Sequence, residues 1–320
     1  MNNFFDKLNA LINKYDNFIL MGHKNPDLDV LGSSLALYGI IKERHKHPYI
    51  FINVNDDNNY NDSIKKSLQK YNFTHVYDDN YRDVLNNCLL IIVDTHQPDR
   101  LEYSKILDNN IDTVVIDHHI MHQNYITDTV LCYNDTKLSS IVELMTYYAD
   151  YCNVSLNPII STIMLAGLEI DTSSYNLKTS ENTYIAASYL MKMGADVMIK
   201  QELLKESKDD YIRRADYIKN SFMINGNIAM CILNNVCMKE ELAEIADELL
   251  KFVSVEASFV IGELRNGNIG ISARSIKEID VEAIMKYFDG GGHSTHAAAE
   301  VKDKTIQEIK NEIIEKVVKK

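Results

Sequence analysis

The sequence has no stretch of about 20 consecutive apolar residues, the length that a membrane-spanning helix requires. It also has no CxxC pair among its five cysteines and no signal peptide at its start. Scattered cysteines of odd number, without the spacing of a zinc site, indicate reduced thiols. We therefore expect a cytoplasmic location and no membrane segment in this chain.

Positive charge is scarce as well, because 33 Lys and Arg stand against 46 Asp and Glu and give a formal net charge of −13. A protein that holds long nucleic acid by its backbone normally presents a basic face. We therefore expect no long nucleic acid among the partners. A small phosphate ligand remains compatible with this charge, because bound cations can dominate the local field of a site.

The first two thirds of the chain alternate short apolar runs with helical patterns. Strands are predicted at 17–22, 49–54, 89–93 and 112–116, and helices at 1–16, 29–43, 138–148, 158–168 and 181–193. The polar stretch 55–61 is predicted to be a loop. Strands mixed with helices on this scale imply an α/β domain, with a parallel sheet that is covered on both faces.

The last third has a different pattern. Residues 195–220 are predicted to form one long charged helix that connects two domains. Strands are predicted after it at 227–233, 254–264 and 268–274, and helices at 239–250, 281–288 and 305–318. The pair Asn266-Gly267 predicts a type I′ hairpin turn, because that turn needs positive φ at both positions. The pattern indicates a smaller α+β domain.

Acidic residues and histidines follow three of the predicted strands in the first domain. They are His23, Asp27 and Asp29 after the first strand, Asp94 and His96 after the third, and Asp117, His118 and His119 after the fourth. Ligands bind at the carboxyl ends of the strands in open α/β sheets, so these side chains are expected at one edge. Asp171 follows an apolar helical stretch and adds a further acid.

This combination of side chains predicts a metal site. Imidazole with several carboxylates suits Mn²⁺, with Mg²⁺, Fe²⁺ or Co²⁺ as substitutes. The set exceeds what one ion needs, which favours two ions ~3.5–4 Å apart that share a carboxylate and clamp an in-line displacement at phosphorus. An aspartate after a strand can also be a helix cap, and a single histidine can be structural, so the interpretation depends on the combination. Four further histidines fit no such pattern: His45, His47, His75 and His122.

The order and spacing of these residues resemble a known superfamily. His23-x3-Asp27-x-Asp29, Asp94, Asp117-His118-His119 and Asp171 resemble the four motifs of the DHH phosphoesterases. Asp289-Gly290-Gly291-Gly292-His293 resembles the GGGH signature of the DHH-associated C-terminal domain. The stretches 22–27, 93–96, 255–259 and 271–275 resemble the catalytic part of GdpP-type cyclic-di-AMP phosphodiesterases. The resemblance implies a DHH metal-binding catalytic domain at 1–194, a helical linker at 195–220 and a DHH-associated substrate-binding domain at 221–320.

The resemblance also implies a role for each site residue. The metal ligands would be His23 and Asp27 on one ion, Asp29, His118 and Asp171 on the other, and Asp94 between both. Asp117 would orient a histidine, as metal sites usually require. His119 would stand beside the scissile phosphate as an electrostatic stabiliser or proton donor. With two Mn²⁺ per chain, a metal-bound hydroxide would attack and the ribose 3′-oxygen would leave.

Substrate contacts are expected in the C-terminal domain. The run Gly290 to Gly292 lets backbone N–H groups approach a phosphate or a base without a Cβ in the way. His293 follows directly, and a helix predicted to begin at Ser294 would add a natural anion site. Arg274, on a predicted strand, is the candidate for a bidentate phosphate contact.

The resemblance to GdpP-type proteins implies a manganese-dependent phosphodiesterase that hydrolyses cyclic-di-AMP to linear pApA. A nanoRNase-type enzyme, which cleaves pApA and short oligonucleotides to mononucleotides, shares every metal ligand and the GGGH motif, so it stays open as the alternative. A DHH-type inorganic pyrophosphatase is disfavoured because its C-terminal domain lacks GGGH. A sensor that binds cyclic dinucleotides without cutting them is disfavoured because the ligand set is complete. A RecJ-type exonuclease is disfavoured because those chains are longer and carry extra nucleic-acid-binding modules.

The chain departs from GdpP-type proteins in several respects. It shows no membrane helices, sensory domain or cyclase-like domain ahead of the catalytic part, so we expect a free-standing version or the cytoplasmic catalytic fragment of a membrane protein. Ile120 and Met121 follow the DHH triplet where relatives usually have a basic residue. His296 stands where relatives often have asparagine. The resemblance further implies a homodimer.

Overall fold

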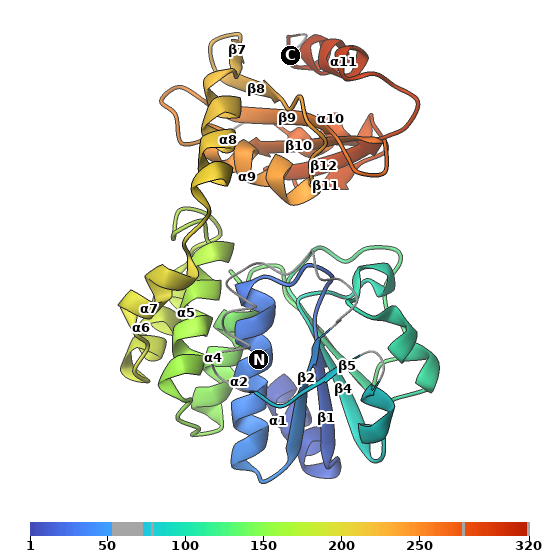
Figure 1. The fold of residues 1–320 in the computed structure, drawn as a ribbon, viewed down its shortest axis with the longest axis vertical. Helices are drawn as coiled ribbons and strands as arrows, with labels where there is room; N and C mark the ends of the chain where they lie inside the picture. The colour runs from blue at the N-terminus through green and yellow to red at the C-terminus, as the bar shows by residue number, and fades with distance from the viewer. Residues whose placement is uncertain (53–72, 78–79, 277–278, 319–320) are drawn as a thin grey trace. The chain divides into compact units, whose positions relative to one another are not determined.

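The computed structural model describes residues 1–52, 73–77, 80–276 and 279–318 (Figure 1). Two compact units make up the chain, Met1–Lys205 and Glu206–Lys320. The predicted loop at 55–61 and the last two positions of the strand predicted at 49–54 lie outside the described residues. Among the described helices, none has the length and apolarity that crossing a membrane requires.

Six described strands form a parallel sheet at the centre of the first unit, in the order β3-β2-β1-β4-β5-β6. Four of them, β1, β2, β4 and β5, are labelled in Figure 1. Its strands are β1 Asn17–Met21, β2 His47–Ile52, β3 His75–Tyr77, β4 Cys88–Val93, β5 Thr113–Asp117 and β6 Leu131–Asn134. Strands β4 and β5 are buried at every position, because their apolar side chains contact protein on both faces of the sheet. The predicted α/β fold is therefore confirmed.

The two faces of this sheet are covered by different structures. One face packs against helices α1 Asn2–Lys14, α2 Leu28–Glu43, α4 Ile141–Tyr151 and α5 Pro158–Asp171, with α6 Glu181–Lys192 and α7 Val197–Leu203 outside them. The other face packs against 3₁₀ turns and loops that contribute Tyr81, Leu101 and Ile106 to a second cluster. The 3₁₀ turns are η1 Tyr81–Val84, η2 Pro98–Arg100 and η3 Ser104–Asn109.

The prediction of one continuous helix at 195–220 is wrong. The structure has two helices there, α7 and α8 Lys208–Lys219, and α7 belongs to the first unit while α8 belongs to the second. Each helix begins at its own cap: Asp196 Oδ1 accepts from the backbone N–H of Met198 at 2.7 Å, and Ser207 Oγ accepts from that of Asp210 at 3.0 Å. These caps satisfy backbone donors at two separate starts, which favours two short helices over one.

The second unit has a mixed six-stranded sheet in the order β11-β12-β10-β9-β8-β7. Its strands are β7 Phe222–Ile224, β8 Ile228–Ile232, β9 Ala257–Glu263, β10 Ile269–Ser275, β11 Gly291–Gly292 and β12 His296–Val301. Only β8 and β9 run parallel, and the other neighbours are antiparallel. Helices α10 Val281–Lys286 and α11 Ile306–Val318 pack on one face, and α8 and α9 Lys239–Leu249 on the other.

The β9–β10 hairpin is present as predicted, but its turn is not type I′. Of the predicted pair, only Gly267 has positive φ, at 80°. The backbone N–H of Gly267 donates to Leu264 at 2.9 Å, and the N–H of Leu264 donates to Asn268 at 2.8 Å. This pattern is a three-residue loop that ends in a left-handed glycine, the second commonest way to close a hairpin.

The prediction of a helix that begins at Ser294 is also wrong. Residues 296–301 form strand β12, which pairs antiparallel with β10. Buried positions alternate along it at Ala297, Ala299 and Val301, the period of a strand with one face on a core. The helix N-terminus that was expected to bind an anion beside the glycines therefore does not exist.

Candidate metal centre

The carboxyl ends of β1, β4 and β5 deliver the predicted site residues to one edge of the first sheet. Parallel register places Met21 beside Ile92, and Val93 beside Ile116, so the residues that follow each strand lie close together. The backbone N–H of Asp94 donates to Ile116 O at 2.9 Å and fixes the end of β4 against β5. Asp94 has a φ of 60°, in the left-handed region that residues other than glycine seldom use.

Asp94 lies between histidines from the two neighbouring strands. Its Oδ2 lies 3.3 Å from His23 Nε2, and its Oδ1 lies 3.1 Å from His118 Nε2. Its side chain is 3% exposed, against 13% for His23 and 2% for His118. Asp94 is thus the single carboxylate that contacts imidazoles following both β1 and β5 among the described residues.

The predicted metal ligands fall into overlapping clusters whose ligand atoms lie within 4.8 Å of one another. These clusters are His23, Asp27 and Asp94; Asp29, His118 and Asp171; and Asp94, His118 and His119. His23 Nε2 lies 3.8 Å from Asp27 Oδ2, and His118 Nε2 lies 3.4 Å from Asp171 Oδ2. The clusters are linked by Asp94 and His118, and together they contain all six predicted ligands.

Asp27 and Asp29 combine a capping contact with a place in the clusters. Asp27 begins α2, and its Oδ1 accepts from the backbone N–H groups of Asp29 and Val30 at 2.9 and 3.0 Å, while its Oδ2 faces His23. Asp29 is fully buried, and its two oxygens accept from the backbone of Ile141 and Val142 at 2.9 and 2.8 Å, at the start of α4. Helix N-termini hold these carboxylates in one orientation.

Two facing acceptor atoms show that a cation fits this site. His118 Nδ1 contacts the carbonyl oxygen of Leu138 at 3.2 Å, so Nδ1 carries a proton and the neutral ring has a bare Nε2. That Nε2 and Asp94 Oδ1 are both buried, without a hydrogen-bond partner among the described residues. Buried acceptors at this distance need a proton or a cation between them. Imidazole nitrogen with carboxylate oxygen is the donor set that Mn²⁺ accepts.

The electrostatics of the cluster show an excess of negative charge. Burial, together with the charge of Asp94, raises the pKa of Asp29 to about 7. Burial and the charge of Asp29 likewise raise the pKa of Asp171 well above its ordinary range. Burial opposes the ionised form of Asp94, but the imidazoles of His119, His118 and His23 outweigh it and hold the pKa of Asp94 well below its usual value. Divalent cations would compensate the remaining carboxylates without protonation.

Asp117 belongs to none of the clusters found among the described residues, and it forms a hydrogen bond with His119. Its Oδ1 accepts from His119 Nδ1 at 2.8 Å and from the backbone N–H groups of His118 and His119 at 2.7 and 3.1 Å. Burial opposes its ionised form, but hydrogen bonds from His119 and His96 keep the pKa of Asp117 below the ordinary value. The His119 side chain is 39% exposed, which makes it the site histidine most accessible to a substrate.

The sequence did not reveal the hydrogen-bond partners of His96. The strand-end pattern grouped it with the metal ligands, yet it belongs to none of the clusters found among the described residues. Its Nδ1 contacts Asp117 Oδ2, and its Nε2 accepts from the backbone N–H of His122 at 2.8 Å. His122, which fitted no pattern in the sequence, is the partner that completes this arrangement.

In the second unit, Arg274 lies on β10 and is largely buried. Its Nε donates to Asp247 Oδ1 of α9 at 2.7 Å, and its Nη1 donates to Ser272 Oγ and to the Ala273 carbonyl, both at 3.1 Å. His296 lies opposite Arg274 in the β10–β12 register. The sequence could not show that an acidic residue of the same unit already pairs with this guanidinium.

The three glycines of the GGGH motif have different surroundings. A Cβ built at Gly290 would lie 2.3 Å from Ala298 O, and one at Gly292 would lie 2.3 Å from His296 O. Gly292 also has a φ of 147°, which side chains rarely adopt. A Cβ at Gly291 would meet nothing within 4 Å. Packing against β12 thus explains Gly290 and Gly292, whereas Gly291 has open space beside its backbone.

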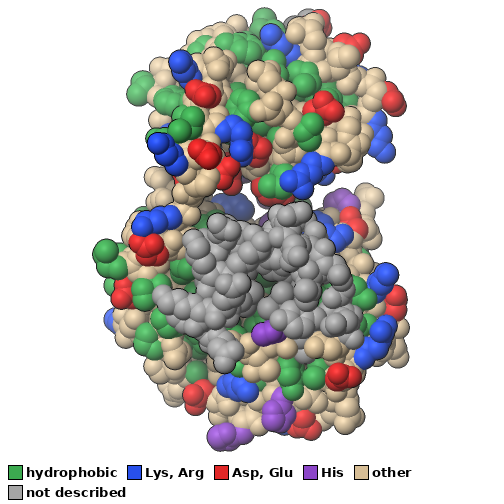
Figure 2. All heavy atoms as spheres, viewed as in Figure 1, with side chains coloured by type: hydrophobic (Ala, Val, Ile, Leu, Met, Phe, Trp, Pro, Cys, Tyr) green, Lys and Arg blue, Asp and Glu red, His purple; other side chains and the backbone are tan. Residues whose placement is uncertain are grey.

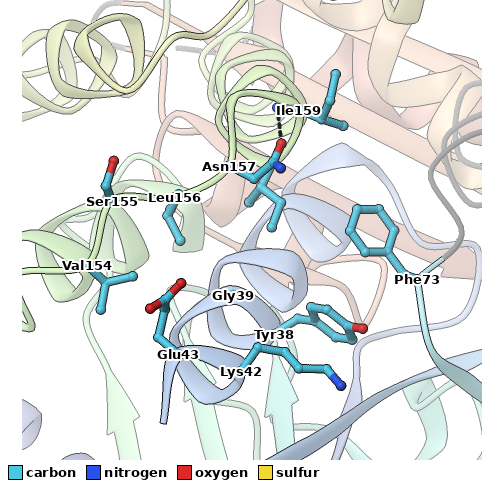
Figure 3. A pocket seen from close by; sticks show the side chains of 11 residues that line it. Tyr38, Gly39, Lys42, Glu43, Phe73, Val154, Ser155, Leu156, Asn157 and Ile159 are labelled. Carbon is cyan, nitrogen blue, oxygen red and sulfur yellow. Dashed lines mark hydrogen bonds between the residues drawn. The ribbon is translucent and has the colours of Figure 1, made fainter. Parts of the chain in front are cut away.

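A cavity of about 290 Å³ lies at the other end of α2 (Figure 3). Tyr38 and Lys42 of α2, Phe73, and Asn157 before α5 are among its lining residues. At about 1.5 Å of helix rise per residue, Lys42 lies roughly 20 Å along α2 from Asp29. The cavity contains none of the predicted site residues.

Two protein-family models match this chain. The DHH family, N-terminal domain, matches residues 17–168, and the DHHA1 domain matches residues 225–319. The chain belongs to the DHH family. The first match includes the strands that deliver His23, Asp94 and His118, and the second includes the glycine motif.

Two curated relatives are similar along most of this chain. The cyclic-di-AMP phosphodiesterase GdpP of Bacillus subtilis is 34% identical over an alignment of 316 positions, which covers 94% of this chain and 47% of GdpP. This chain therefore spans about half the length of that relative. The bifunctional oligoribonuclease and PAP phosphatase NrnA of Mycoplasma genitalium is 25% identical over an alignment of 323 positions, which covers 98% of this chain and 97% of NrnA.

Solved structures share the fold of this DHH protein. An exopolyphosphatase-related protein from Bacteroides fragilis has a TM-score of 0.81 at 19% identity and is covered over 98% of its chain. The exonuclease RecJ bound to manganese has a TM-score of 0.55 at 10% identity and is covered over 95%. The whole of this chain is covered in the first comparison and 99% in the second. At these identities the likeness supports the fold and nothing finer.

Proposed function

We propose that this DHH phosphoesterase is a manganese-dependent phosphodiesterase that hydrolyses cyclic-di-AMP to linear pApA. The observation that carries the proposal is the position of Asp94, whose two carboxylate oxygens face His23 and His118 in neighbouring clusters. One carboxylate shared by two ligand sets is what a two-metal phosphoryl-transfer site requires. The 34% identity to GdpP supports the cyclic dinucleotide as substrate.

In this proposal the first unit binds the metals and performs the cleavage. His23 and Asp27 would hold one ion, Asp29, His118 and Asp171 would hold the other, and Asp94 would serve both. Bound divalent ions supply Lewis-acid stabilisation of phosphoryl oxygens and lower the pKa of water. The protein's own part is to fix the ligands through the starts of α2 and α4 and to exclude water from the buried carboxylates.

His119 is the proposed proton donor or electrostatic stabiliser at the scissile phosphate. Its Nδ1 is engaged by Asp117 Oδ1 at 2.8 Å, so the proton of the neutral ring lies on Nδ1. Its Nε2 then carries a proton only when the ring is an imidazolium, which is the form that can donate to substrate; the bare Nε2 of the neutral ring can only accept. Asp117 does not bind metal in this proposal; it holds the imidazole and favours this tautomer.

The proposed substrate-binding domain 221–320, which lies within the second unit, contributes the contacts that select the ligand. The backbone of Gly291 has open space beside it, where a substrate group could approach. His293 follows strand β11, and its backbone N–H donates to His296 O at 2.6 Å. Arg274 is the proposed phosphate contact, and its pairing with Asp247 pre-orients the guanidinium. Long nucleic acid is not expected as a partner in this proposal, because the chain has a formal net charge of −13. On the face drawn in Figure 2, acidic and basic side chains are interspersed.

A nanoRNase-type activity is the second candidate, and one observation favours it. NrnA is similar over 97% of its length, whereas GdpP is matched over 47%. This chain therefore corresponds to nearly the whole length of NrnA, which is named for an oligoribonuclease activity. The same metal ligands would serve both reactions, so the difference would lie in whether the substrate is cyclic or linear. The homodimer and the cytoplasmic location stay predictions.

A product time course separates the two functions. The purified chain with Mn²⁺ would receive cyclic-di-AMP and, in a separate reaction, pApA, and products would be resolved by chromatography. Fast conversion of cyclic-di-AMP with accumulation of pApA supports the proposal. Slow attack on cyclic-di-AMP with rapid conversion of pApA to AMP supports the nanoRNase alternative. Hydrolysis of pyrophosphate with neither dinucleotide cleaved would overturn both.

A further inference from the structure

His96 is held by both of its ring nitrogens. It follows β4, is 2% exposed, and contacts Asp117 Oδ2 through Nδ1. Its Nε2 accepts from the backbone N–H of His122 at 2.8 Å. Because a backbone N–H can only donate, Nε2 carries no proton, and the proton of the ring lies on Nδ1. The fold therefore fixes one tautomer, which donates to Asp117.

Asp117 extends this constraint to His119. One of its oxygens faces His96, and the other accepts from His119 Nδ1 at 2.8 Å. The plane of the carboxylate is therefore set from both sides. Without His96, the Asp117 side chain would keep the bonds on Oδ1 but lose the contact that stops it from rotating. The orientation and tautomer of His119 would then be less well determined.

We propose that His96 is a positioning residue for phosphodiester cleavage, acting through Asp117 on His119. This inference rests on the proposed function, in which His119 contacts the scissile phosphate. Outer partners of this kind typically change metal affinity or activity by about 10–100-fold. Because His96 does not touch substrate in this account, its loss lowers kcat and leaves KM nearly unchanged.

The rival role for His96 is to anchor the loop between β5 and β6. That loop has other anchors that do not use the imidazole. The backbone N–H of Ile126 donates to the His96 carbonyl at 2.9 Å, and Asn124 Nδ2 donates to Asp99 Oδ1 at 3.0 Å. Both bonds persist when only the ring is replaced, so the two roles can be separated by substitution.

Three substitutions separate the effects of the two hydrogen bonds that the His96 ring makes. His96→Asn places an amide nitrogen where Nδ1 lies and nothing at Nε2, so it keeps the bond to Asp117 alone. His96→Gln reaches the position of Nε2 and keeps the bond to the His122 N–H alone. His96→Leu removes both. His45→Asn is the matched control, because His45 is exposed and its positive φ of 58° is one that asparagine tolerates.

Steady-state kinetics on the dinucleotide substrate, with Mn²⁺ content and Tm measured for each variant, gives the first readout. We expect His96→Gln and His96→Leu to lower kcat about 10–100-fold with KM within about twofold, and His96→Asn to stay within a few-fold of wild type. If His96→Gln kept activity and His96→Asn lost it, the imidazole would act by anchoring the loop between β5 and β6, and the proposal would be overturned. Activity kept by all three variants would overturn it as well.

A spectroscopic readout tests the link without turnover. Two-bond ¹H–¹⁵N spectra of the full chain with Mg²⁺, a diamagnetic ion, report the tautomer of each neutral imidazole. We expect the Nδ1–H form of His119 in wild type and His96→Asn, and a mixture of forms in His96→Leu. An unchanged His119 in His96→Leu overturns the proposal. If wild type cleaves no dinucleotide while His119 still responds to His96, the proposed function fails and the positioning link stands.

Discussion

Asp94 Oδ1 lies 3.1 Å from His118 Nε2, and neither atom has a hydrogen-bond partner among the described residues. Since Leu138 O accepts the Nδ1 proton of His118, the neutral imidazole presents a lone pair to a carboxylate. Two acceptors would repel at this distance unless the ring is protonated or a cation lies between them. Burial by itself would lower the pKa of His118, but the contact with Asp94 outweighs that effect and raises the pKa of His118 to about 10. The fold therefore maintains a buried position for positive charge.

The first prediction concerns Asp94, which faces both ligand sets. Asp94→Asn keeps the size of the side chain but removes the charge that both sets share. We expect turnover to fall by more than about 100-fold, because even outer partners of metal ligands cost about 10–100-fold. Bound Mn²⁺, measured by elemental analysis after gel filtration, should fall in parallel. Asp128→Asn, at an exposed loop position, is the control and should retain both. Clearly retained activity in Asp94→Asn would remove Asp94 from the bridging role.

The second prediction separates packing from substrate contact in the glycine motif. Gly291→Ala meets open space, so its Tm should stay close to wild type. Its KM should rise if substrate approaches that backbone. Gly290→Ala places a Cβ against the Ala298 carbonyl and should destabilise the second unit by about 1–3 kcal/mol. Urea unfolding and steady-state kinetics check both variants. An unchanged KM in a folded Gly291→Ala protein would assign the motif to packing alone.

The third prediction concerns the pair formed by Arg274 and Asp247. Arg274→Ala should raise KM with kcat nearly unchanged, because a contact to a non-reacting phosphate acts equally in ground and transition states. Asp247→Asn keeps the guanidinium and should leave KM within a few-fold of wild type. Both variants should lower Tm modestly, because each leaves a largely buried partner unpaired. A pure fall in kcat for Arg274→Ala would contradict its place on a non-reacting phosphate.

The fourth prediction is a pH dependence of stability in the second unit. Hydrogen bonds from Lys239, Asn268 and Asn266 lower the pKa of Glu300 from 4.5 to about 2. A depressed folded-state pKa stabilises the protein above the unfolded value, and this contribution is lost as pH falls from about 4.5 towards about 2. The free energy of unfolding of Glu300→Gln should thus be below wild type at pH 7, with the difference shrinking by pH 3. A difference that is constant with pH would show that the charge of Glu300 is unimportant.

The arrangement of the first sheet explains why its site residues could be predicted from the sequence. A parallel sheet brings all its carboxyl ends to one edge, so residues following β1, β4 and β5 must converge whatever the details of packing. His23, Asp94 and His118 follow those three strands directly or within two residues. Their convergence is a property of topology, which the apolar runs already specify.

Other features depend on pairing between distant segments and left no signal. The run from His296 to Val301 contains three alanines, which favour helix locally, yet pairing with β10 makes it a strand. The contact of His96 with Asp117 joins residues 21 positions apart and needs the β4–β5 register. The pairing of Arg274 with Asp247 joins β10 to α9, and no periodic pattern predicts which acid faces a given arginine.

Anomalous diffraction at the manganese edge from crystals of the full chain tests the central claim most directly. If two ions share Asp94, two manganese peaks are expected, one on each side of its carboxylate. The first peak should lie among His23, Asp27 and Asp94, and the second among Asp29, His118 and Asp171. A single peak away from Asp94, or peaks that omit either His23 or His118, would contradict a shared carboxylate and with it the two-metal mechanism.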